Sequence, residues 1–132
     1  KVVKMIAENH SIDYIGNKMK SFYNVSPQKH YITQNNNSIL IAQVTYVDKY
    51  GNVFLNVKDS DFNKIRNNRS FKILVGGEYI ENISLSYADV ELCRTLLTIS
   101  SSGYLQLALR EGNFSRLLGV RTDDSIKITF GE

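Results

Sequence analysis

From Ser38 onward, most apolar residues recur at every second position, in short segments separated by turns rich in Gly, Ser or Asn. This period is that of a β-strand, and closely spaced strands with few helices favour a β-sandwich or barrel. The alternating segments are residues 39–47, 53–57, 71–75, 79–83, 96–100, 105–109 and 126–130. We therefore predict a mainly β fold, a closed or nearly closed β-barrel with one or two short helices, over residues 38–132.

The longest alternating segment, residues 39–47, is apolar on both sides, which predicts a strand buried on much of both faces. Four of its residues are expected on one face and three on the other. Those on the first face are Leu40, Ala42, Val44 and Tyr46, and those on the second are Ile39, Ile41 and Val47.

Two short helices are expected between the strands. Asp59 or Ser60 can cap the first helix, because both side chains accept hydrogen bonds from free backbone N–H groups. Asn113 can cap the second, over residues 114–118, and Gly119 can end it in a left-handed conformation.

The composition is that of a globular domain of ordinary polarity. The chain has 132 residues, 42% of them hydrophobic and 22% charged, which is enough for one domain with a substantial core. Its net charge of +3 is spread along the sequence, and no apolar run approaches the roughly 20 residues that span a membrane. No signal peptide is visible. We expect a cytoplasmic protein that binds neither a membrane nor a nucleic acid.

The cysteine and the histidines predict no disulfide and no metal site. Cys93 is the only cysteine, and neither His10 nor His30 has a Cys or Glu at metal-ligand spacing. We expect Cys93 to be a buried, unreactive thiol, with Leu92 beside it and no His nearby in sequence.

Residues 1–37 differ from the rest of the chain. Residues 2–7 can form a short helix with one apolar face, and residues 21–37, rich in Ser, Asn and Gln, have the composition of a connector. We therefore divide the chain into a linker, residues 1–37, and a barrel domain, residues 38–132.

The turn that joins the first two strand segments holds an unusual set of side chains. Asp48 can pair with a cation, Tyr50 offers a flat ring for stacking, and Asn52 can hydrogen-bond an edge such as that of adenine. Phe54 follows as a pocket wall or as part of the core. The same residues are also typical of a plain hairpin, in which Gly51 and Asn52 shape the turn and Asp48 only caps it.

A second turn has the chemistry of an anion site. Ser101 and Ser102 offer two hydroxyls and, with Gly103, consecutive backbone N–H groups suited to a carboxylate. A run of serines is equally typical of a flexible hairpin. The strand that follows, residues 105–109, leads into another turn at Glu111.

Together, the Asp48-Lys49-Tyr50-Gly51-Asn52 turn and the segment from Ser101 to Asn113 resemble the C-terminal domain of the S-adenosylmethionine hydrolases, or SAM hydroxide adenosyltransferases. These are relatives of the bacterial fluorinating and chlorinating enzymes. The family carries an Asp-x-Phe-Gly-Asn turn, a Ser-Ser-Gly-Tyr-Leu strand start and an Asn-Gln-Gly-Asn turn. Tyr50 stands in place of the family's Phe, and Arg110-Glu111 in place of its Asn-Gln.

The resemblance implies a site for S-adenosylmethionine, which binds as the substrate with no further cofactor. Asp48 would meet the ammonium group of the methionine moiety, and Ser101 and Ser102 would bind its carboxylate. Some relatives have Arg in place of Ser102, whereas the hydrolases commonly have Ser. This residue therefore favours a hydrolase over a halogenating enzyme.

The resemblance also implies how the adenine binds. Tyr50 would stack on the ring, Asn52 would hydrogen-bond its edge, and Phe54 would form a wall of the pocket. The backbone from Leu109 to Glu111 would border the base.

The implied reaction converts S-adenosylmethionine and water to adenosine and L-methionine. In the family, the groups that activate the water lie in an N-terminal α/β domain, and trimers form with each site between one subunit's N-terminal domain and a neighbour's C-terminal domain. We find no such domain and no catalytic arrangement in this sequence, so we assign no catalytic residue and expect no turnover by this chain alone. The resemblance implies that residues 1–37 are the linker or tail of a missing N-terminal α/β domain and that residues 38–132 are the C-terminal substrate-binding domain.

Two other functions are compatible with the residues taken alone. The barrel could be a non-enzymatic interaction module that binds a partner or an oligosaccharide through its loops. It could also be a weak RNA-binding barrel, as its excess of basic residues and its eight tyrosines allow; binding that falls steeply with salt would favour this.

Overall fold

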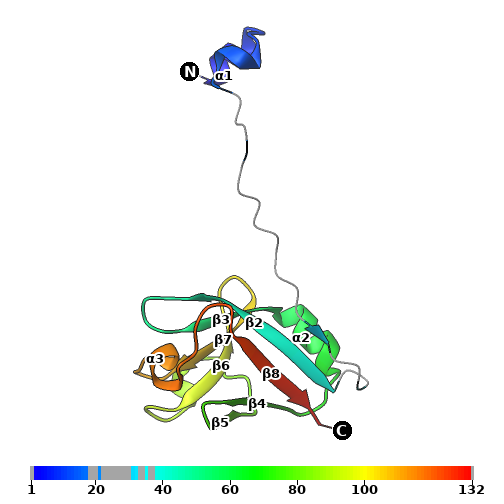
Figure 1. The fold of residues 1–132 in the computed structure, drawn as a ribbon, viewed down its shortest axis with the longest axis vertical. Helices are drawn as coiled ribbons and strands as arrows, with labels where there is room; N and C mark the ends of the chain where they lie inside the picture. Colours follow the sequence, from blue (N-terminus) through cyan, green and yellow to red (C-terminus); the bar gives the residue numbers. More distant parts are fainter. Residues whose placement is uncertain (1, 18–20, 22–30, 33–34, 36–37, 132) are drawn as a thin grey trace.

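The computed structural model describes residues 2–17, 21, 31–32, 35 and 38–131. Its barrel strands are antiparallel and follow the order β5-β4-β8-β2-β3-β7-β6, and the short strand β1 also pairs with β2 (Figure 1). The strands are β1 (Tyr31–Ile32), β2 (Ile39–Val47), β3 (Val53–Lys58), β4 (Phe71–Val75), β5 (Glu78–Ile80), β6 (Thr95–Ile99), β7 (Tyr104–Leu109) and β8 (Ser125–Phe130). The helices are α1 (Val2–Ala7), α2 (Asp59–Arg66) and α3 (Phe114–Leu118).

The sheet nearly closes on itself, as the sequence predicts. The two end strands, β5 and β6, come together through residues just after β5, where Ile83 forms a parallel bridge with Leu97. Seven strands and short helices therefore confirm the predicted mainly β, nearly closed barrel. Among the described residues, no helix is both long enough and apolar enough to cross a membrane.

The inward-facing residues of the strands form one core. Leu40, Leu55, Leu107 and Ile128 have no exposed surface, as the alternation predicts. Helix α2 adds Phe62, whose ring packs edge-on against Phe71, with the ring centroids 5.2 Å apart, and against Phe130 at 5.7 Å. Full burial of one such side chain is worth about 2–3 kcal/mol, so α2 is held to the barrel mainly by this ring.

A β-bulge corrects one part of the predicted alternation. Val44 pairs with Leu55, but Tyr46 pairs with Phe54, so β2 has one extra residue between them, at Thr45. A bulge shifts all following side chains to the opposite face. Tyr46 is therefore 56% exposed on the outer face rather than sharing the inner face with Val44.

The helix ends are partly as predicted. Asn113 caps α3, its Oδ1 accepting from the N–H of Arg116 at 2.7 Å, and Gly119 ends the helix in the left-handed conformation. The predicted cap of α2 is wrong, because that helix already includes Asp59 and its N-cap is Lys58, with no side-chain bond. Asp59 instead accepts from Asn63 Nδ2 within the helix, at 2.8 Å.

Cys93 is exposed, which corrects the prediction of a buried thiol. It lies in an irregular turn with φ of 59°, and its N–H donates to the carbonyl of Arg110 at 3.0 Å. The apolar neighbour Leu92, which suggested burial, is itself 58% exposed.

The N-terminal part is described only in pieces. The predicted short helix is present as α1 and is followed by a 3-10 turn, Ile12–Tyr14. Most of the predicted connector, residues 21–37, lies outside the described residues, as does His30.

Candidate functional site

The Asp48–Asn52 turn is organised by the Asp48 carboxylate. Its Oδ1 accepts from the backbone N–H groups of Tyr50 and Asn52, both at 2.9 Å, and its Oδ2 accepts from Asn52 Nδ2 at 2.9 Å. Gly51 takes the positive φ of the turn, 86°, whereas Asn52 does not. The carboxylate is thus fixed in direction, and the Asn52 amide keeps its Oδ1 and one N–H for another partner.

The two sequence motifs meet at Gly51. A Cβ atom on this glycine would lie 2.1 Å from the side chain of Asn113, so only the absence of a side chain permits the contact. The carbonyl of Gly51 also accepts from the N–H of Ser115 at 3.0 Å, in the first turn of α3. The first motif is therefore fastened to the end of the second.

An open hollow lies on this side of the barrel. It has a volume of about 420 Å³ and is lined by Leu109, Asn113, Arg116 and Leu117. Leu109 is one of the predicted backbone contacts of adenine, and Glu111 follows in a turn with φ of 53°. Tyr50 is 65% exposed, with Lys49 Nζ 4.9 Å from its ring centroid.

Ser101 and Ser102 lie at the opposite end of β7. Their turn precedes Tyr104, while Leu109 and Glu111 follow at the other end, about 20 Å away for a strand of this length. The turn is held by a bond between the hydroxyls of Ser100 and Ser102 at 3.0 Å and by positive φ at Gly103. The structure does not bring these serines next to Asp48.

Phe54 belongs to a row of side chains across the outer face of four strands. Tyr46, Phe54, Gln106 and Thr98 lie on β2, β3, β7 and β6, and each is the direct cross-strand partner of the next. The Tyr46 and Phe54 rings are 5.6 Å apart. Phe54 is therefore not part of the barrel core, and its half-buried ring lies beside Tyr46, with Gln106 as its cross-strand partner on β7.

Tyr87 contacts this row at Gln106 and was not singled out from the sequence. It lies in a 3-10 turn, Tyr87–Asp89, within the irregular segment between β5 and β6. Its hydroxyl accepts a hydrogen bond from Gln106 Nε2 at 2.7 Å. A residue in a segment without periodicity gives no signal in the sequence, because only the folded chain places it over β7.

The negative charge of Asp48 affects the pKa of Tyr87. Burial raises the pKa of the Tyr87 hydroxyl, and the negative charge of Asp48 raises this pKa further. The phenol is consequently neutral at physiological pH. A carboxylate, a neutral phenol and two aromatic rings thus share the outer face beside the Asp48–Asn52 turn.

This arrangement can bind a ligand but offers no acid–base or nucleophilic set. Among the residues that the structure describes, no three His, Cys, Asp or Glu side chains gather as metal ligands. The chemistry available among these residues is hydrogen bonding, stacking and charge pairing, which are the interactions that bind a ligand.

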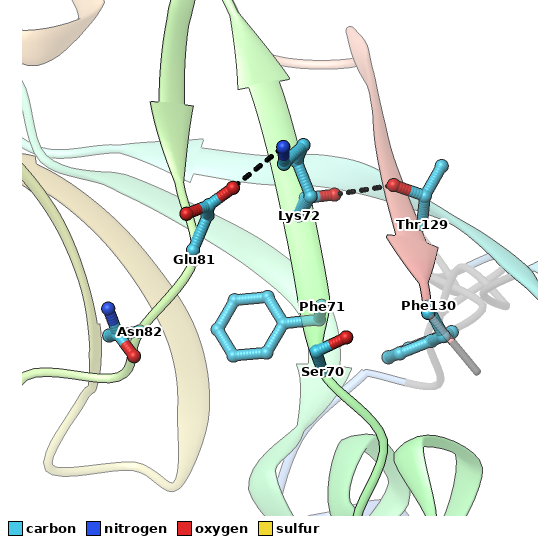
Figure 2. Close-up of a pocket in the computed structure, with 8 residues that line it drawn as sticks. Ser70, Phe71, Lys72, Glu81, Asn82, Thr129 and Phe130 are labelled. Carbon is cyan, nitrogen blue, oxygen red and sulfur yellow. Dashed lines mark hydrogen bonds and ion pairs between the residues drawn. The ribbon is translucent and has the colours of Figure 1, made fainter.

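A larger hollow lies elsewhere on the barrel and contains none of the predicted site residues (Figure 2). It has a volume of about 570 Å³ and lies between the start of β4, the chain after β5 and the end of β8. Figure 2 shows Lys72 turned toward Glu81, with which it forms an ion pair at 2.7 Å. Because its two charged side chains neutralise each other, this hollow is a weaker candidate for binding a charged ligand than the face around Asp48.

Two solved structures align with this chain. An uncharacterized conserved protein from Thermotoga maritima aligns with a TM-score of 0.69 and 24% identity, over 97% of this chain and 49% of that chain. A conserved hypothetical protein from Thermus thermophilus aligns with a TM-score of 0.49 and 15% identity, over 69% of this chain and 34% of that chain. The first similarity supports the fold, and this chain spans about half the length of the Thermotoga protein. No curated protein sequence matches the chain.

The family is identified from the sequence. Residues 42–127, which include both motifs and nearly all the barrel strands, match the SAM hydroxide adenosyltransferase C-terminal domain. Since the match covers well over half of the chain, the protein belongs to the family of SAM hydroxide adenosyltransferase C-terminal domains.

Proposed function

We propose that this chain is the S-adenosylmethionine-binding domain of a hydrolase that converts S-adenosylmethionine and water to adenosine and L-methionine. The observation that carries the proposal is the fixed Asp48 carboxylate beside an aromatic outer face, in a chain of this family. S-adenosylmethionine has an ammonium group, a sulfonium cation and a purine. A carboxylate and aromatic rings are the protein groups that suit these three.

The ligand would lie along the outer face of β3 and β7. Its adenine would rest against Tyr50 and the free edge of Asn52, near the backbone of Leu109 to Glu111. The methionine moiety would extend toward Ser101 and Ser102, at the other end of β7. Phe54 would contact the middle of the ligand, and Asp48 would attract its positive charges.

This chain would form only one wall of the active site. In the proposed reaction, a hydroxide attacks the ribose carbon bonded to sulfur, and the sulfonium leaves as the neutral thioether of methionine. Neither motif supplies a group to activate the water, so that group would come from an N-terminal α/β domain of a neighbouring subunit in a trimer. The Thermotoga protein, about half of which this chain spans, has room for such a domain.

The direct test is calorimetric and chromatographic. We expect the full-length natural polypeptide that contains this chain to bind S-adenosylmethionine and to release adenosine and methionine in equal amounts. We expect this chain alone to release neither and to bind the substrate weakly, since the contacts from the other domain would be absent.

Two outcomes would contradict the proposal. Turnover by the purified 132-residue chain would show that its own residues catalyse the reaction. If the full-length protein bound S-adenosylmethionine but released no adenosine, the chain would be a binding domain, and the proposed hydrolase activity would be wrong. Adding chloride or fluoride to the same assay as an alternative nucleophile would detect a halogenating relative.

A further inference from the structure

The amide of Gln106 determines which way the Tyr87 hydroxyl can donate. Gln106 is only 8% exposed, although it lies on the outer face of the barrel, and its Nε2 donates to the Tyr87 oxygen at 2.7 Å. A phenol that accepts this bond has its own proton left to donate. Among the described residues, no acceptor for that proton is found within hydrogen-bonding distance.

The segment that carries Tyr87 is anchored independently of any ligand. Ser86 caps its 3-10 turn by accepting from the N–H of Ala88 at 3.1 Å, and Asp89 accepts from the N–H of Ser86 at 2.8 Å. On the β7 side, Arg110 Nη1 donates to the carbonyl of Val90 at 2.6 Å. The fold therefore sets the position of the phenol, and Gln106 sets its hydrogen-bonding direction.

The surroundings of Tyr87 indicate which part of the ligand it would meet. Gln106 lies midway along β7, between Ser102 at one end and Glu111 at the other. If adenine binds at the Glu111 end and the carboxylate at the Ser102 end, the ribose and the sulfonium lie near Gln106. The sulfonium cation offers no lone pair that could accept a strong hydrogen bond, whereas the ribose oxygens do.

We propose that the Tyr87 hydroxyl, oriented by Gln106, donates a hydrogen bond to a ribose oxygen of the bound nucleoside and makes the site specific for it. Tyr87 would be a binding residue, and Gln106 a positioning residue that acts through it. This inference rests on the proposed function, since it needs a nucleoside to lie along β7. The neutral phenol that the raised pKa of Tyr87 maintains is the form that can donate.

The test uses calorimetric titration of the full-length protein with three probes: S-adenosylmethionine, adenosine and L-methionine. Tyr87→Phe should weaken the binding of S-adenosylmethionine and adenosine by about five- to tenfold, the effect of one hydrogen bond, and should leave L-methionine unchanged. Gln106→Leu should have a similar effect, because the phenol loses its orientation. The double variant should bind no more weakly than Tyr87→Phe, since the two residues act as one unit.

A matched control removes the same atom elsewhere. Tyr79, on β5, is 59% exposed, and Tyr79→Phe should change none of the three affinities. Melting temperatures show whether each variant is folded. If Gln106→Leu does not fold, the affinities of Tyr87→Phe alone test the proposal.

The outcomes distinguish a failure of this inference from a failure of the proposed function. Tight binding of adenosine by the wild type with no change in Tyr87→Phe would overturn this inference alone. An equal loss for L-methionine would place Tyr87 at the other end of the ligand and would also overturn it. Failure of the wild type to bind S-adenosylmethionine or adenosine would overturn the proposed function as well.

Discussion

Replacing Gly51 by Ala should lower the free energy of unfolding by about 3–4 kcal/mol, combining a left-handed backbone with an overpacked contact. Gly51 has φ of 86°, where an L side chain is strained, and its Cβ would lie 2.1 Å from the Asn113 side chain. To relieve this overlap, Asn113 would have to abandon its bond to the N–H of Arg116 and so uncap α3. Chemical denaturation of the wild type and the variant measures the difference.

Gly77 provides the matched control for Gly51→Ala. It has the same φ, 86°, but a Cβ added there would meet nothing within 4 Å. Gly77→Ala should therefore lower the free energy of unfolding only through the strain of a left-handed backbone, by about 1–2 kcal/mol. Equal losses in the two variants would mean that the contact between the two motifs contributes nothing to stability.

Replacing Asp48 by Asn should weaken the binding of S-adenosylmethionine to the full-length protein by about tenfold or more, because the cationic ligand loses the attraction of a nearby carboxylate. The stability should change by less than about 1 kcal/mol. An Asn in this place still accepts from the N–H groups of Tyr50 and Asn52 through its Oδ1. The Asn52 amide can turn over to accept from the new NH₂, because it has both an acceptor and a donor side.

The control for Asp48→Asn removes a carboxylate that lies away from the site. Glu81 pairs with Lys72 in the larger hollow, which contains none of the predicted site residues. Glu81→Gln should leave the affinity for S-adenosylmethionine unchanged and should alter the stability by less than about 1 kcal/mol, the scale of an exposed ion pair. If Asp48→Asn has no effect in the titration, Asp48 only shapes its turn, and the proposed attraction between its carboxylate and the positive charges of the ligand is wrong.

The predicted site residues fall into two groups in the structure. Asp48, Tyr50 and Asn52 lie with Leu109 and Glu111 at one end of β7, and the contact between Gly51 and Asn113 holds them there. The Ser101-Ser102 turn lies at the other end, so its carboxylate role requires a ligand that spans the strand. The roles of all these residues are predictions for the titrations described above.

The sequence by itself determined the strands, the turns between them and the barrel class. Period-two alternation places Leu105, Leu107 and Leu109 on one face wherever the strand lies, because neighbouring side chains point to opposite sides. The cap and the stop of α3 were equally readable, since Asn113 and Gly119 act on backbone groups within a few residues. These features are local, so local sequence is enough to specify them.

The tertiary structure alone decided the outer face. The bulge at Thr45 turns Tyr46 toward Phe54, and its position depends on how β2 and β3 pair rather than on any residue pattern within β2. The same holds for Tyr87, which meets Gln106 only because the chain between β5 and β6 crosses over β7. Both arrangements depend on which residues of different strands and loops face each other, and this register is set by the packing of the whole barrel.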